Sequence, residues 1–180
     1  APRPENPKKF NFHGMELRCP RNLRLAGLQI AAPNADPDAG FSIAALIVAD
    51  GDVIIESCRM SMAGEATGRF DFASWGKHNG NLWIRDCDFN RHIFPLMHGS
   101  SVVIERTRIR DDQLEAIHLY PRTPPREFVF RNNITHGQHG LLYGMLPNEA
   151  LPAEWTDVPI LIANARALDD DAGTVHERKD

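Results

Sequence analysis

Histidines gather in one part of this chain of 180 residues. Five of the eight fall between residues 92 and 139, namely His92, His98, His118, His136 and His139. Histidine gives and takes protons near neutral pH, so such a group could serve general acid–base chemistry. Lys77 and Arg122 would add positive charge that neutralises a carboxylate on a ligand. The alternative is that these are ordinary turn and surface residues.

His118, Tyr120 and Arg122 are the candidate catalytic residues. Residues 116–120 read as a strand in which Ile117 and Leu119 would point inward. Alternation then places His118 and Tyr120 on the outer face, and Arg122 lies on the turn that follows. Neighbouring turns would supply the residues that contact a substrate, which are Lys77, His78, His92, His98 and Trp75.

Signals for metals and cofactors are weak. The chain has no Walker-type phosphate loop, no GxGxxG motif and no CxxC pair, which argues against nucleotide and structural-zinc proteins. Residues 111–112 and 169–171 are aspartates that could offer oxygens to calcium, although such runs are usually solvated. His136 and His139 could share a transition metal, although a pair on a glycine-rich turn is usually incidental. We therefore predict no metal site and no cofactor, with calcium as the alternative.

Composition narrows the class of protein. Hydrophobic residues make up 42% of the chain and charged residues 24%, as in a folded globular or solenoid domain. The net charge of −4 predicts no broad binding to nucleic acid. The longest apolar run, over 43–49, is a buried strand rather than a membrane helix, so no membrane partner is expected.

Residues 1–9 read as a polar leader, a linker or a processed mature end. A chain that begins at Ala rather than Met fits the removal of an export signal, and a shortened chain would look identical. We expect a secreted or periplasmic protein. Cys19, Cys58 and Cys87 do not make a disulfide framework.

A short pattern recurs along the chain: apolar, any, apolar, any two residues, a small residue or thiol, any, apolar. Its copies begin at residues 23, 53, 82, 102, 128 and 160, and are therefore 20 to 32 residues apart. A second strand precedes the later copies, over 42–48, 70–73, 94–97, 116–120 and 140–143. Each coil would bury its apolar face only by stacking on its neighbours. The sequence predicts a single-stranded right-handed parallel β-helix of about six coils over residues 10–168, followed by an acidic tail over 169–180 that could shield one end.

Columns of the repeat support this register. The fourth position reads Glu56, Arg85, Glu105, Arg131, and the seventh reads Arg59, Asp88, Arg108. Both alternate in sign, so each charge would have an opposite charge on the next coil, about 4.8 Å away. The sixth position, predicted to point inward, reads Leu28, Cys58, Cys87, Thr107, Asn133, Ala165. Cys58 and Cys87 could form a disulfide, but stacked buried thiols are favoured, and an inward Asn133 could not accept the glycan that its sequon suggests.

The second position of the repeat should point outward and yet is apolar. It reads Arg24 and then the five predicted interface residues Ile54, Trp83, Val103, Val129 and Leu161. A sheet that is apolar on both faces must be covered by something. A segment of the same chain or a second copy of it would serve.

The repeat resembles the coil of the pectate-lyase-like right-handed β-helices, a superfamily that includes pectate lyases, polygalacturonases and phage tailspikes. The resemblance covers roughly residues 10–168 and is specific for the fold rather than for activity. It implies a polysaccharide cleft on the outer face of the sheet that contains 116–120. It does not provide the family's acidic residues there, since the expected central column is Asp71, Pro95, His118, Leu142.

We therefore expect an exported β-helix that binds or modifies a polysaccharide, and the sequence leaves lyase, hydrolase and epimerase chemistry open. The alternative is a non-catalytic module that self-associates through its apolar sheet face.

Overall fold

The computed structural model describes residues 10–32, 41–63, 68–74, 80–96, 100–111, 117–118, 125–137, 142–143, 159–163, 166–168 and 175–177. All regular secondary structure in these residues is β-strand. The strands form three sheets, here called A, B and C, and within the described residues all neighbouring strands run parallel except β18 and β19. The chain folds as a parallel β-helix, which confirms the predicted fold class.

Each coil passes through sheets A, B and C in that order. Sheet A contains β1 (Phe10–Cys19), β4 (Phe41–Ala49), β7 (Gly68–Ser74), β10 (His92–Leu96), β13 (Ile117–His118) and β16 (Leu142–Tyr143). Sheet B contains β2 (Leu23–Ala26), β5 (Val53–Glu56), β8 (Leu82–Arg85), β11 (Ser101–Glu105), β14 (Glu127–Arg131) and β17 (Ile160–Ala163). Sheet C contains β3 (Gln29–Ala32), β6 (Arg59–Met62), β9 (Asp88–Phe89), β12 (Arg108–Asp111), β15 (Ile134–Gly137), β18 (Arg166–Leu168) and β19 (Val175–Glu177).

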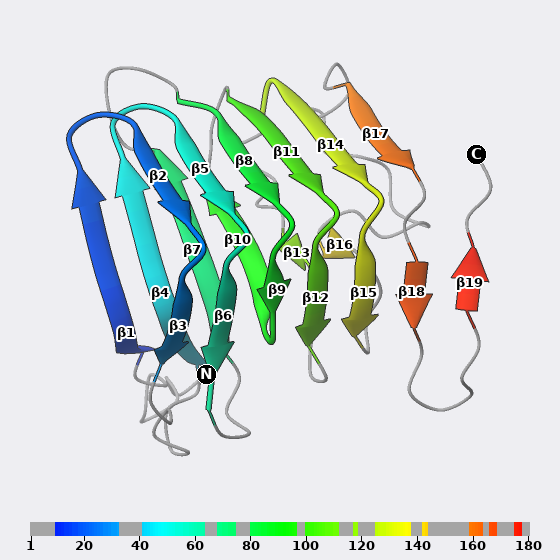
Figure 1. Ribbon diagram of the computed structural model, residues 1–180, viewed down its shortest axis with the longest axis horizontal. Helices are drawn as coiled ribbons and strands as arrows, with labels where there is room; N and C mark the ends of the chain where they lie inside the picture. The colour runs from blue at the N-terminus through cyan, green and yellow to red at the C-terminus, as the bar shows by residue number, and fades with distance from the viewer. Residues whose placement is uncertain are drawn as a thin grey trace, which may run out of the picture.

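The coils wind in a right-handed sense. In Figure 1 the chain rises at the back through β1, crosses over the top, descends in front through β2 and β3, and advances into β4. This is the hand that twisted parallel strands favour for such connections. Sheet B holds one strand from each copy of the repeat, and the first residues of the six copies lie in one row.

Aromatic side chains fill the middle of the stack. Phe70 and Phe72 from sheet A point across the interior at Phe89 from sheet C, with ring centroids 5.4 Å and 6.1 Å apart in edge-to-face geometry. All three side chains are fully buried. Alternation along the short strands directs these residues inward, so each coil gains its apolar core from its neighbours.

The turn between sheets B and C is built from two adjacent columns. The first column holds the left-handed backbone conformation, with φ between 49° and 66° at Gly27, Ser57, Asp86, Arg106 and Asn132. This conformation reverses the side-chain alternation, so that the next residue points inward. The predicted inward column is confirmed at Cys58, Cys87, Thr107 and Asn133, which are all buried.

Leu28 has the same place after Gly27 but is 43% exposed. Leu28 belongs to the first copy of the repeat, so only the coil that follows can cover it. Ala165 lies outside the described residues. Cys58 and Cys87 are free thiols, as favoured from the sequence.

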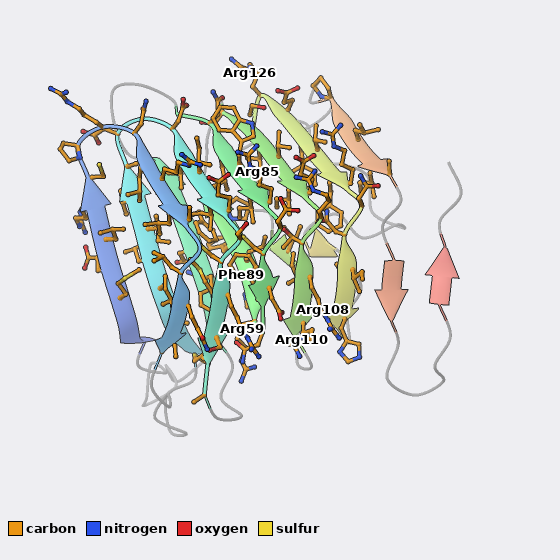
Figure 2. All side chains as sticks on the ribbon, viewed as in Figure 1. Arg59, Arg85, Phe89, Arg108, Arg110 and Arg126 are labelled. Atoms are coloured by element: carbon orange, nitrogen blue, oxygen red, sulfur yellow. The ribbon has the colours of Figure 1, made fainter. Side chains whose placement is uncertain are left out.

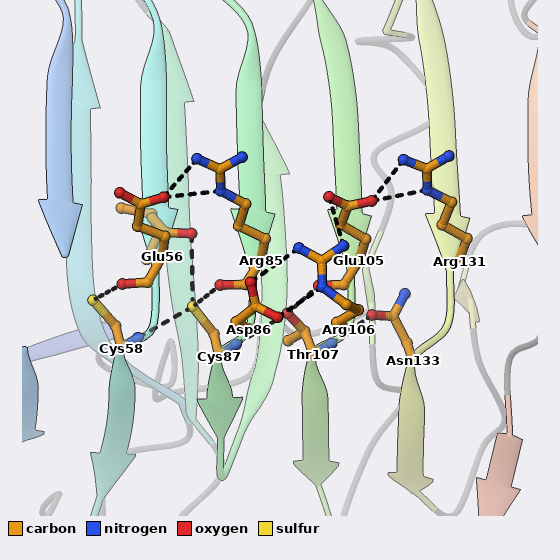
Figure 3. A network of polar contacts seen from close by, with 11 residues as sticks. Glu56, Cys58, Arg85, Asp86, Cys87, Glu105, Arg106, Thr107, Arg131 and Asn133 are labelled. Carbon is orange, nitrogen blue, oxygen red and sulfur yellow. Dashed lines mark hydrogen bonds and ion pairs between the residues drawn. The ribbon is translucent and has the colours of Figure 1, made fainter. Parts of the chain in front are cut away.

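The charge column on the outer face of sheet B is confirmed by ion pairs between coils. Arg85 Nη2 lies 2.6 Å from Glu56 Oε2, and Arg131 Nη2 lies 2.7 Å from Glu105 Oε2 (Figure 3). Arg24 forms a further ion pair with Glu56.

The second charge column behaves differently. Arg59, Asp88 and Arg108 stand in register, as predicted. Asp88 nevertheless forms its ion pair with Arg110, whose Nη2 lies 3.2 Å from Asp88 Oδ1. The expected ion pairs within the column are therefore wrong, because a residue two positions further along β12, on the same face, takes the carboxylate.

Sheet A departs from the predicted register. The column expected to be central was Asp71, Pro95, His118 and Leu142. Asp71 instead pairs with Phe94, one residue before the proline, and His118 pairs with Tyr143, one residue after the leucine. Strands such as β4 are apolar on both faces, so alternation in the sequence could not fix which residues point outward.

At the C-terminal end of the stack, an antiparallel strand covers the edge of sheet C. Val175–Glu177 forms β19, which pairs antiparallel with β18 and covers its edge within the segment predicted to be a tail. Residues 1–9 lie outside the described part of the chain. The described residues contain no helix that could cross a membrane.

Candidate functional site

Arginines gather on the outer face of sheet C. A depression of about 510 Å³ there is lined by Arg59, Arg91, Arg108 and Arg110, together with His136 and the acid Asp88. We call this surface the arginine face. In Figure 2, Arg59, Arg108 and Arg110 lie close to one another over β6 and β12. Alternation explains the placement, because Met60, Phe89 and Ile109 between them point into the core.

Part of the positive charge on the arginine face is left without a counter-charge. Asp88 binds Arg110, but among the described residues neither Arg59 nor Arg108 has an ion pair. The Nε atom of Arg110 is buried and has no hydrogen-bond acceptor within the part of the chain that the structure describes. Buried donors normally have partners, so an orphaned guanidinium nitrogen beside unpaired arginines points to an anionic ligand.

A hydrogen-bonded asparagine supports this surface. The side chain of Asn90 accepts a hydrogen bond from Met62 N at 2.8 Å and donates one to Met62 O at 2.9 Å. The carbonyl oxygen of Asn90 in turn accepts a bond of 2.7 Å from Arg91 Nη1. The end of β9 is thereby tied to β6, and Arg91 is held beside the depression.

A second depression, of about 650 Å³, follows the outer side of the turn between sheets B and C. It shares Arg59, Asp88 and Arg108 with the arginine face, so the two form one continuous surface. The charges of Arg106 and Asp86 in its lining neutralise each other. Arg106 Nε and Nη2 donate hydrogen bonds to the Asp86 carboxylate at 2.7 Å and 2.9 Å. This contact holds the pKa of Asp86 below its ordinary value.

The lining of this second depression includes Cys58 and Cys87. Burial raises the pKa of the Cys87 thiol to about 11. A thiol with so high a pKa is almost entirely protonated at neutral pH and is a poor nucleophile. The Cys87 thiol is therefore not activated for reaction in this depression.

The outer face of sheet A is largely closed at its centre. Asp71, His92 and Phe94 alternate with inward residues and so point outward, yet only 2%, 1% and 6% of their surfaces are exposed. Arg69 lies across them, with its Nε 2.5 Å from Asp71 Oδ1 and its guanidinium 4.2 Å from the Phe94 ring centre. The predicted substrate-binding residue His92 is thus inaccessible to a large ligand in this conformation.

The other predicted residues of this site cannot be placed together. The backbone of His118 lies in β13 beside Tyr143 of β16. Its side chain, and the predicted residues Tyr120, Arg122, Lys77, His78, His98 and Trp75, lie outside the described residues. Their grouping stays a prediction.

The apolar stripe on sheet B stands as predicted. Ile54, Trp83, Val103, Val129 and Leu161 pair in a single row across the sheet. The first four are partly exposed, and Leu161 is 49% exposed. The stripe is therefore partly accessible to solvent, and its role as an interface stays a prediction.

No metal site can be built from the described residues, which contain no group of three histidine, cysteine, aspartate or glutamate side chains placed to hold an ion. Asp112, His139 and residues 169–171 lie outside them. The prediction that the protein has no resident metal stays untested.

Comparisons with protein-family models, with curated proteins and with solved structures find no match for this chain. The fold thus defines the class of protein, a parallel β-helix.

Sequence reasoning missed the arginine face. The missing signal was the ninth position of the repeat, which reads Ala31, Ser61, Asn90, Arg110, His136. This column becomes visible once the seventh position, two residues earlier, is recognised as outward. Read together, the two columns bring Arg59, Arg108 and Arg110 onto one surface.

Proposed function

We propose that this β-helix binds an acidic polysaccharide along the arginine face. One observation carries the proposal: among the described residues, four arginines and one acid line a single depression, and two of the arginines have no ion pair with any described residue. Guanidinium groups bind carboxylates and sulfates through paired hydrogen bonds. Neighbouring coils lie about 4.8 Å apart, so Arg59 and Arg108, which are two coils apart in one column, stand about 10 Å from each other, and this spacing suits an extended ligand with repeated charges.

A polysaccharide is favoured over a nucleic acid as the polyanion. Single-stranded nucleic acids are usually held by stacking of bases on aromatic side chains, and the described residues that line the arginine face include no Phe, Tyr or Trp. The net charge of −4 gives no long-range attraction for either polyanion, so the choice between them depends on the absence of aromatic side chains among these described lining residues.

The proposal includes the finer expectations from the sequence. We infer kinship with the pectate-lyase-like superfamily from the repeat, and an exported location from the class of ligand. A reaction at His118, Tyr120 and Arg122, whose side chains lie outside the described residues, is a further hypothesis. Binding requires no reaction, so it is the conclusion drawn.

Calorimetric titration tests the proposal. The wild-type protein should bind polygalacturonate or a sulfated dextran, and should not bind neutral dextran. The double variant Arg59→Gln/Arg108→Gln should lose at least about tenfold in affinity, because each charged hydrogen bond contributes about 1.5–3 kcal/mol. Wild-type affinity should fall as salt rises, and more steeply than that of the double variant.

Arg126→Gln is the matched control. Arg126 is an exposed arginine at the other end of the sheet B strands (Figure 2), so removing its charge should leave the affinity unchanged. The double variant removes two charges and the control removes one, so an equal loss of binding free energy per charge in both would mean that only net charge matters. Tighter binding of single-stranded DNA than of any glycan would overturn the choice of polysaccharide. An increase in ultraviolet absorbance on incubation with polyuronate would reveal a lyase.

A further inference from the structure

The outer face of sheet B combines an open apolar row with a charged row of a particular symmetry. The apolar row runs through Ile54, Trp83, Val103 and Val129, all partly exposed. Two residues further along the same strands runs the charged row of Glu56, Arg85, Glu105 and Arg131. An apolar row of this kind on an outer sheet face is a surface suited to a partner.

The charged row has an even number of members and alternates in sign. Reversing such a row end to end places every acid opposite a base. The reversed copy of Glu56 faces Arg131, and the reversed copy of Arg85 faces Glu105. The row is therefore complementary to itself in one orientation, which is the condition for an interface made by two identical surfaces.

We infer that a second copy of this chain docks on the outer face of sheet B, about a two-fold axis that runs parallel to the strands between β8 and β11. Rotation about this axis reverses the order of the coils, so that β8 of one copy faces β11 of the other. Residues at the same position along their strands then face each other across the interface. Trp83 then packs against Val103 of the second copy, and Ile54 against Val129 of the second copy. The apolar rows meet in the middle, with charge pairs along one side.

The other face-to-face two-fold axis, along the stack, is less favourable. It would place the charged row against the row at the start of the same strands, which includes Asp52, Asn81, Ser101 and Glu127. Glu56 would then face Asp52, and only Arg131 would face an acid. The axis parallel to the strands also brings Asp52 opposite Glu127, at the start of the strands. This repulsion is outweighed, because there are twice as many attractive pairs in the charged row.

The size of the surface predicts a weak, reversible dimer. Four to six strands at about 4.8 Å spacing and about five residues at about 3.3 Å give a footprint of roughly 400 Å² per copy. The two copies together would bury roughly 800 Å², which is below the range of stable specific interfaces, so dissociation constants in the micromolar range or above are expected. Sedimentation equilibrium should therefore extend to millimolar protein.

Charge-row variants test the orientation. The acidic variant Arg85→Glu/Arg131→Glu and the basic variant Glu56→Arg/Glu105→Arg should each sediment as monomers, because every facing pair becomes like-charged. An equimolar mixture of the two should form a heterodimer at least as readily as the wild type forms its dimer. Circular dichroism would confirm that both variants fold.

Two further variants distinguish docking on sheet B from a general effect of net charge. Val103→Lys should abolish the dimer by placing a charge in the apolar row. Arg59→Glu/Arg108→Glu changes the net charge as the acidic variant does, but on sheet C, and should remain dimeric. A wild-type protein that is monomeric at millimolar concentration, or charge-row variants that dimerise like the wild type, would overturn the inference. Neither result bears on glycan binding.

Discussion

One residue in each of the first five coils adopts a left-handed backbone conformation at the turn between sheets B and C. Among these residues Gly27 has φ of +66°, and a Cβ added to it would have no atom within 4 Å. Asn132, Asp86 and Ser57 hold the same conformation with side chains. The cost at this position is therefore one of backbone conformation rather than of space.

Substitution of Gly27 should separate these two costs. Gly27→Val is expected to lower the free energy of unfolding by about 1–2 kcal/mol, because β-branched residues tolerate positive φ poorly. Gly27→Asn should cost only a few tenths of a kcal/mol, since asparagine occupies the equivalent position at residue 132. Urea denaturation measures both. Equal losses in the two variants would show that the turn does not require this conformation.

The inward column of the same turn is a ladder of side chains that bond to backbone on the preceding coil. Asn133 Oδ1 accepts a hydrogen bond from Thr107 N at 2.8 Å, and Asn133 Nδ2 donates one to Ile104 O at 2.9 Å. Thr107 Oγ1 accepts one from Cys87 N at 3.4 Å, and Cys87 Sγ one from Cys58 N at 3.5 Å (Figure 3). The ladder satisfies backbone groups that the turn would otherwise bury unpaired.

Loss of the buried asparagine should be costly. Asn133→Ala removes both bonds at a side chain that is 1% exposed, and we expect a loss of about 2–4 kcal/mol in the free energy of unfolding. The control is Asn22→Ala, which removes an acceptor for Asp52 N on the exposed side of the stack. Water can replace Asn22, so less than about 1 kcal/mol is expected. Comparable losses measured by denaturation would contradict the ladder.

At the scale of the strand, the ion pairs of sheet B join neighbouring coils. Arg85, and then Arg24, hold the pKa of Glu56 below its ordinary value of 4.5. Arg131, and then Arg106, lower the pKa of Glu105 in the same way. A lowered carboxyl pKa means that the folded state prefers the charged form. The resulting stability is present above the ordinary pKa and is lost as pH falls through the lower, folded value.

The free energy of unfolding should therefore fall as pH is lowered from about 5 towards 2, over the range set by the lowered pKa values. Glu56→Gln/Glu105→Gln should flatten this dependence, and added salt should weaken it in the wild type. Asp50→Asn, at an exposed acid with no ion pair among the described residues, is the control for the loss of a carboxylate. A double variant with the wild-type slope would exclude these pairs as its source.

The strands of sheet B were predictable because their repeat is short and regular, with an apolar residue at each inward position. Charges at Glu56 and Arg85 then fixed the register independently. The register of sheet A could not be predicted in this way, because β4 is apolar on both faces and its pairing with β7 shifts between Ile43 and Ala45. The shift changes which residues face outward. Proline at 95 was expected outside and instead pairs with the inward Phe72.

The candidate site was predictable only where a column was read in full. Alternation placed the apolar stripe of sheet B correctly, since Ile54 and Trp83 lie within strands whose register the repeat had already fixed. The arginine face depends on Arg110 and His136, which lie beyond the residues that define the repeat. The closure of sheet A combines the local ion pair of Arg69 with Asp71 and the contact of Arg69 with Phe94 on the next coil, and the second of these is not revealed by any local pattern.

At the scale of the whole molecule, the stack converts spacing along the chain into rows on a surface. Each of the three sheets presents one such row outward: a closed polar centre on A, an apolar row on B and arginines on C. The surfaces of B and C are separate, so a second copy on sheet B would leave the arginine face of sheet C free. A dimer of this kind would present two cationic surfaces to one polysaccharide chain.

Amide chemical-shift mapping tests the central claim most directly. Titration of the isotopically labelled protein with an acidic oligosaccharide should shift the amide signals of Arg59, Arg108, Arg110 and His136 in β6, β12 and β15. Signals around Phe70 and His118 on sheet A should stay in place. Shifts centred on sheet A, or no shifts at saturating oligosaccharide, would contradict binding at the arginine face.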